Sequence, residues 1–140
     1  MFLGCSLLEN APVLPATSLA KECYVAMFAE CTSLVEAPEL PATELAEGCY
    51  GDMFSRCTSL TKAPILPAPT LVMYCYQGMF MFCENLNYIE AMFTTRPSGD
   101  YTYDWVYGVS STGTFVKNRY ATWDVFGEDG IPEGWTVQTK

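Results

Sequence analysis

The sequence predicts an α/β solenoid, a right-handed coil in which each 26-residue repeat contributes one short strand and one short helix. The dipeptide Met-Phe recurs at residues 1, 27, 53 and 79, and the three full copies are identical at 12 of their 26 positions. Each copy also divides into a proline-containing stretch and a stretch with apolar residues at helical spacing. A fixed period of this length is typical of repeat proteins, whose neighbouring units stack and share one core.

The first half of each copy predicts a short extended strand. The segment 31–41 of the second copy contains Pro38 and Pro41, and both prolines recur in the neighbouring copies. Proline has no N–H to donate, and it pushes the preceding residue toward extended backbone. We therefore expect a strand that pairs with the same segment of the next copy through only a few backbone hydrogen bonds.

The second half of each copy predicts a short helix. Counted from Ala46, apolar residues stand at positions i, i+3, i+4, i+7 and i+8, and the series continues to Cys57. This spacing is the stripe expected of an amphipathic helix. One strand and one helix then complete one turn of the coil.

The repeat motif resembles a known family. It reads Cys-x-x-Leu-x-x-Ala-Pro-x-Leu-Pro, followed by Met-Phe-x-x-Cys, and it extends from residue 1 to about residue 90. It resembles the cysteine-bearing leucine-rich repeats of bacterial surface proteins, often called BspA-like or Treponema-type repeats. Those repeats usually have Ile in place of Ala-Pro and Ala-Phe in place of Met-Phe. The resemblance implies a leucine-rich-repeat-like fold, a cell-surface or secreted location, and adhesion to a host matrix protein or another cell-surface component.

The repeat pattern ends near residue 93, which predicts two parts. Residues 1–93 form the solenoid, with three full repeats and one partial one, and residues 94–140 form a small β-rich cap. In the cap, aromatic residues alternate with smaller ones from Tyr101 to Val109, and a second strand follows a turn at 110–113. Alternation on both sides of a turn predicts a β-hairpin.

Two interpretations of the aromatic tail are open. An exposed solenoid end needs a terminal unit that covers its core, so the aromatic side chains are expected to pack on the last repeat. The alternative is a carbohydrate-binding platform, in which Trp105 and Trp123 stack on sugar rings. The segment Gly-Ile-Pro-x-Gly-Trp-Thr-Val near the end resembles a tail found on some repeat proteins of gut-type bacteria, and that tail has no activity attached to it.

Composition disfavours several classes of function. The formal net charge is -9, which disfavours binding to nucleic acids and to anionic membrane surfaces. No apolar run approaches the roughly 18 residues needed to span a bilayer. The chain has no histidine, so triads that depend on histidine and imidazole metal ligands are excluded. We expect no enzymatic activity, no metal and no cofactor.

The beginning of the chain lies within the repeat pattern. No signal peptide is recognised there, because Met1 takes the repeat phase of Met27 and is followed by repeat sequence. We expect the chain to be part of a longer array. The apolar residues Met1, Phe2 and Leu8 would then lie at an open repeat edge, through which copies of the chain could associate.

Seven cysteines recur in phase with the repeat. Disulfides such as Cys23–Cys31 are one possibility, but eight helical positions separate two Cα atoms by about 12 Å. A disulfide tolerates only about 4.4–6.8 Å. We therefore expect two ladders of reduced, buried thiols that pack between the repeats.

Positions that vary between copies predict where a partner binds. In leucine-rich solenoids the strands line a concave face, whose variable side chains are free to contact another protein. The candidate partner-binding residues are Asn10, Val13, Glu36, Glu39, Lys62 and Ile65. We expect a non-enzymatic protein-recognition or adhesion module. The alternative is a structural spacer and cap for a longer array.

Overall fold

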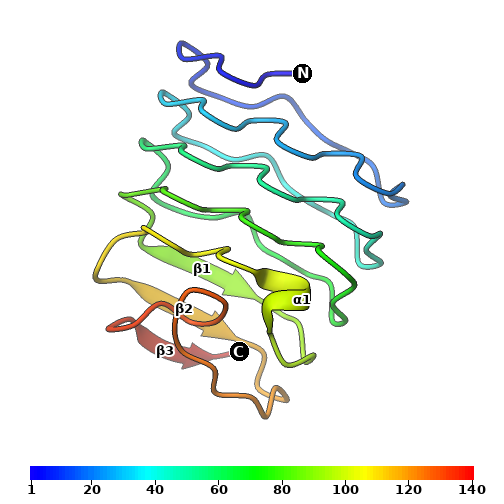
Figure 1. The fold of residues 1–140 in the computed structure, drawn as a ribbon, viewed down its shortest axis with the longest axis vertical. Coiled ribbons are helices and arrows are strands. Elements are labelled where there is room, and N and C mark those ends of the chain that lie inside the picture. The colour runs from blue at the N-terminus through cyan, green and yellow to red at the C-terminus, as the bar shows by residue number, and fades with distance from the viewer.

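The computed structural model describes residues 1–140. Successive 26-residue copies lie one above another in a stack, and the two termini lie at its opposite ends (Figure 1). Regular secondary structure is confined to the C-terminal part, where the elements are β1 (Tyr88–Ala91), α1 (Gly99–Thr102), β2 (Thr114–Lys117) and β3 (Thr136–Thr139). The single helix α1 has four residues, and the structure contains no helix long and apolar enough to cross a membrane.

One side of the stack consists of overlapping turns, so the helix expected from Ala46 to Cys57 is wrong. Within a copy, every second N–H donates to the carbonyl three residues earlier, as from Cys49 to Ala46 at 3.1 Å. Left-handed backbone recurs every four residues, for example at Gly48 (φ 61°) and Asp52 (φ 52°). A residue with positive φ is what the third position of a type II turn requires. We call this side the turn wall; it comprises residues 22–30, 48–56, 74–82 and 100–108.

The remaining N–H groups of the turn wall link the copies. In residues 22–30, 48–56 and 74–82, each of these groups donates to a carbonyl of the next copy. For the first two ranges, the accepting peptide group in turn donates to the copy beyond. Continuous chains of hydrogen-bonded peptide groups therefore run along the stack. One such chain runs from Phe28 to the carbonyl of Met53, from Phe54 to that of Met79 and from Phe80 to that of Trp105, each at 2.9 Å.

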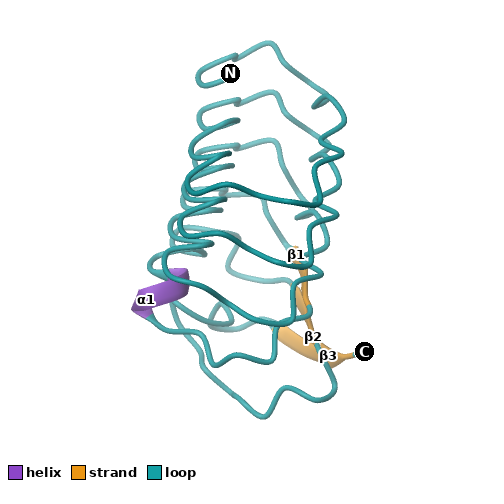
Figure 2. Ribbon diagram, turned by 90° about the vertical axis from the view of Figure 1, so that its right-hand side faces the viewer, coloured by secondary structure: helices purple, strands orange, loops and turns teal.

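The opposite side, which we call the extended wall, comprises residues 9–15, 35–41, 61–67 and 87–93. Figure 2 shows α1 and the strands on opposite sides of the stack. One backbone hydrogen bond joins the first two segments of the extended wall, none joins the second and third, and four join the third and fourth.

Proline explains where a regular strand forms on the extended wall. In the fourth copy, Glu90 and Phe93 replace Pro64 and Pro67 of the third. Because proline lacks an N–H and has a fixed φ, it is poorly tolerated within a paired strand. The first regular strand, β1, accordingly lies in segment 87–93, the first extended segment without prolines.

The C-terminal part continues the stack, so the expected hairpin is wrong. β2 pairs in parallel with β1 on one side and with β3 on the other, with Thr114 opposite both Tyr88 and Thr136. Residues 103–108 form turns. They accept hydrogen bonds from the preceding copy, as Tyr107 does from the N–H of Phe82 at 2.7 Å. The backbone pattern therefore passes through residue 93 without interruption.

The core lies between the two walls and consists of stacked side chains. Phe2, Phe28, Phe54 and Phe80 form one ladder, with successive ring centroids 5.4, 5.7 and 5.8 Å apart. A second ladder contains Tyr24, Tyr50 and Tyr76. Thirty buried residues make one continuous cluster along the stack, so each copy is stabilised by its neighbours.

The cysteines form ladders within this core. All seven are free thiols, of which Cys5 is exposed, Cys23 is half-buried and the other five are buried. The thiols of Cys31, Cys57 and Cys83 donate to backbone carbonyls of the preceding copy at 2.9, 3.1 and 3.0 Å. Burial raises the pKa of the Cys57 thiol to about 12, which keeps it protonated and unreactive at neutral pH.

Thiol labelling checks the arrangement of the ladders. In native protein without reductant, dithionitrobenzoate should label Cys5 rapidly and Cys23 more slowly, because only these two thiols have solvent access. In denaturant all seven thiols should react. A titre below seven in denaturant would show that disulfides form, and rapid labelling of five more thiols in the native protein would contradict their burial.

Candidate protein-binding groove

A groove of about 610 Å³ opens in the extended wall between the second and third copies. Residues 35–41 line one side, and Lys62, Ala63, Pro64, Ile65 and Pro67 line the other. No backbone hydrogen bond joins segment 35–41 to segment 61–67. The groove therefore lies where neighbouring segments of the extended wall share no backbone hydrogen bond.

Pairing on either side explains why the wall opens at this place. The second copy is drawn toward the first, because the N–H of Val35 donates to the carbonyl of Glu9 at 2.9 Å. The third copy pairs with the fourth, where the N–H of Ala63 donates to the carbonyl of Tyr88 at 3.0 Å. On the extended wall, no backbone hydrogen bond runs between the second and third copies, and the gap lies between them.

The groove is mainly apolar. Pro38, Ala63 and Pro64 are buried in it, while Val35 and Ile65 keep 50% and 48% of their surface exposed. Apolar surface that remains in water favours the binding of another apolar group. The two aliphatic side chains can therefore lose solvent contact when a partner binds.

Acidic side chains dominate the charge of the groove. Glu36 and Glu39 line it and are exposed, and neither belongs to the three ion pairs of the chain. On the other side, the Nζ atom of Lys62 lies 5.2 Å from the ring centroid of Tyr88. This cation–π contact engages the ammonium group with the fourth copy. The two carboxylates are left without a cationic partner.

The structure brings together four of the six residues that the sequence predicted for partner binding. Glu36, Glu39, Lys62 and Ile65 line the same groove. Asn10 and Val13 lie outside it, in the first copy, where Asn10 forms an isolated bridge with Glu36. Sequence reasoning missed the prolines and alanines that form the groove surface. Their signal was the double proline motif in two adjacent copies.

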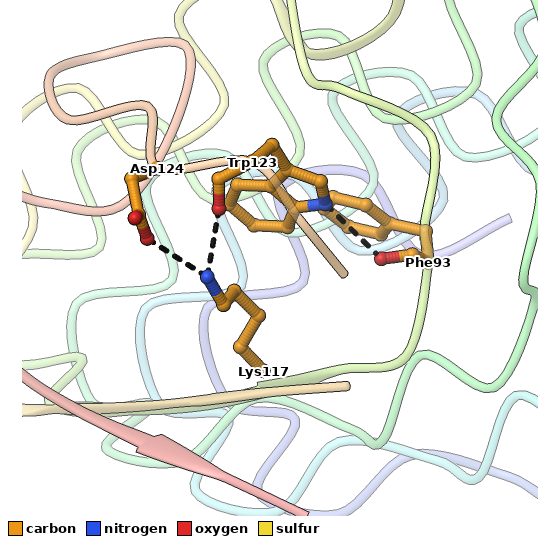
Figure 3. A network of polar contacts seen from close by, with 4 residues as sticks. All are labelled: Phe93, Lys117, Trp123 and Asp124. Carbon is orange, nitrogen blue, oxygen red and sulfur yellow. Dashed lines mark hydrogen bonds and ion pairs between the residues drawn. The ribbon is translucent and has the colours of Figure 1, made fainter. Parts of the chain in front are cut away.

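The tail does not offer tryptophan faces to a sugar, which corrects the glycan-stacking role considered for Trp105 and Trp123. Trp105 is 0% exposed and Trp123 is 3% exposed. The Trp123 ring stacks on Phe93 at 5.3 Å, and its indole N–H donates to the Phe93 carbonyl at 3.3 Å (Figure 3). Both rings belong to the continuous core of the stack.

A buried lysine completes this packing. The Nζ atom of Lys117 donates to the carbonyl of Trp123 at 2.7 Å and to Asp124 at 2.8 Å (Figure 3). It also lies 5.2 Å from the Trp123 ring centroid. Two hydrogen bonds to oxygen and a cation–π contact make the burial of this charge tolerable.

Two other surfaces are less specific. A hollow of about 780 Å³ beside the turn wall is lined mostly by polar residues and carries Arg56, whose guanidinium lies 4.6 Å from the Phe82 ring centroid. At the N-terminal edge, Met1 is exposed, while Phe2 and Leu8 are half-buried against the second copy. Self-association through this edge stays a prediction.

The side chains of the groove are suited to recognition. Aliphatic and proline surfaces bind apolar groups, and the free carboxylates bind cations. In the whole structure, no group of three or more Cys, Asp and Glu side chains is placed to hold a metal ion. Comparisons of the chain with protein-family models, curated proteins and solved structures find no match.

Proposed function

We propose that the chain is a protein-recognition module of a bacterial surface protein, built on leucine-rich-repeat-like solenoid units, and that the groove is its contact surface. The observation that carries this proposal is the convergence of Glu36, Glu39, Lys62 and Ile65 on one groove. These positions vary between copies whose scaffold residues are constant.

A binding screen with matched variants tests this function. The purified chain is applied to immobilised extracellular-matrix proteins and glycans, and the affinity for any protein found is measured by surface plasmon resonance. Ile65→Ala should weaken binding at least about tenfold, which corresponds to about 1.4 kcal/mol. The physical reason is that Ile65 supplies exposed aliphatic surface within the groove.

Val13→Ala is the matched control. Val13 occupies the same repeat position as Ile65 two copies earlier, is 85% exposed and lies outside the groove. It should bind like the unaltered chain. Equal losses of affinity in the two variants would contradict the groove as the contact surface. If the chain binds no protein, the result would favour the structural spacer function instead. A glycan that binds would need a surface other than the two buried indole rings.

A further inference from the structure

The shape of the groove fits an extended chain. Its two sides are segments 35–41 and 61–67, in which four prolines and the residues before them are held in extended backbone. Seven extended residues span about 23 Å at roughly 3.3 Å per residue. A partner segment of similar length, also extended, can therefore lie along the groove and contact both copies.

The apolar part of the groove indicates one class of side chain that a partner would carry. Val35 and Ile65 stand on opposite sides, and Ala37, Pro38, Ala63 and Pro64 add small side chains and proline rings to the lining. Surfaces of this kind accept aliphatic side chains by burying area from water. Such side chains on a partner would cover Val35 and Ile65.

The charges of the groove indicate the other class of side chain on the partner. Glu36 and Glu39 have no ion-pair partner, Lys62 is engaged by Tyr88, and the whole chain has a formal net charge of -9. An acidic segment would meet two free carboxylates and a repulsive field, whereas a basic segment would gain charge-assisted hydrogen bonds. The groove therefore discriminates by the sign of charge.

We infer that the groove binds an extended segment of a protein partner in which lysine or arginine side chains alternate with aliphatic ones. This inference rests on the proposed function and names the chemistry of its partner. Alternation follows from extended backbone, because successive side chains point to opposite sides. One set reaches the carboxylates while the other covers the apolar surface.

Fluorescence anisotropy with a defined probe tests the inference. The probe is the fluorescein-labelled, end-capped peptide Lys-Val-Lys-Val-Lys-Val-Lys, and the comparison peptide has Glu at every Lys position. The basic peptide should bind and the acidic one should not. In the double variant Glu36→Gln/Glu39→Gln, the Kd of the basic peptide should rise at least about tenfold, because both charge-assisted contacts are lost.

The double variant Glu44→Gln/Glu133→Gln provides the control for net charge. Both of these residues are exposed, have no ion pair and lie outside the groove. This variant should keep the original Kd, and unchanged urea midpoints should show that all variants are folded. Equal losses in the two double variants, binding of the acidic peptide, or no binding of the basic peptide would each overturn the inference. In those cases, a protein partner whose binding is weakened by Ile65→Ala would still support the proposed function.

Discussion

Replacing Phe54 by alanine is expected to lower the free energy of unfolding by about 3–5 kcal/mol. The ring is fully buried and stacks between Phe28 at 5.7 Å and Phe80 at 5.8 Å. Its removal leaves a cavity in the middle of the core and separates the copies above and below it. The loss is a large part of the roughly 5–15 kcal/mol that stabilises an ordinary domain. The measurement is urea-induced unfolding followed by tryptophan fluorescence.

Phe2→Ala is the matched control for this prediction. Phe2 belongs to the same ladder, but it is half-buried and has one ring neighbour, Phe28, at 5.4 Å. The expected cost is only about 1–2 kcal/mol, because less surface returns to water. Equal costs at the two positions would show that the ladder does not act as one continuous core.

Raising the pH from 9 to 11 is expected to destabilise the fold strongly. Burial raises the pKa of the Cys57 and Cys75 thiols from about 9 to about 12. Between these values the unfolded chain loses protons that the folded chain retains, so stability is highest below pH 9 and falls as the pH rises. Each thiol contributes about 1.4 kcal/mol per pH unit, and the two together remove roughly 5 kcal/mol over two units.

A cysteine variant isolates this effect. The double variant Cys57→Ala/Cys75→Ala should be less stable than the original chain at pH 7, because packing and the Cys57 hydrogen bond to the Phe28 carbonyl are lost. That difference should shrink as the pH rises from 9 to 11, since the variant has fewer thiols to ionise. A constant difference across this range, measured by urea unfolding at each pH, would contradict the pKa assignment.

The sequence predicted that neighbouring copies stack and that cysteines are buried between them, but it did not predict the backbone of the turn wall. Apolar pairs stand at 45–46, 49–50 and 53–54, which is a period of four residues. On an α-helix such pairs would drift by about 40° with every step, because four residues exceed one turn of 3.6. Over a short segment this drift is easily mistaken for a helical stripe. The unbroken period of four was the available signal for consecutive turns.

The strand predicted in the aromatic tail was wrong for a related reason. Tyr101, Tyr103, Trp105 and Tyr107 alternate as in a strand, yet Trp105 is buried while Tyr103 and Tyr107 are exposed. Burial therefore follows a period of four, as in the turn wall of the copy before. The parallel pairing of β2 with β1 depends on the whole stack, and local periodicity does not reveal it.

The candidate site was predicted in part because variable positions on a constant scaffold point to a surface. Asn10 and Glu36 occupy equivalent positions, as do Val13 and Ile65, and the repeat alone gives no reason to separate them. The difference between them arises because no backbone hydrogen bond joins the extended segments of the second and third copies. This missing pairing is a property of the packed stack, so the sequence of a single repeat does not contain it.

The hydrogen-bonded chains of the turn wall also give the stack an electrical direction. All of their N–H groups point toward the C-terminal copies, so the peptide dipoles add along the stack as they do along a helix. At the positive end of one chain, the N–H of Asp104 meets a carboxylate oxygen of Asp129 at 2.8 Å. Asp129 thus does for a stack of turns what an acidic N-cap does for a helix, and its negative charge compensates the summed dipole of four successive copies.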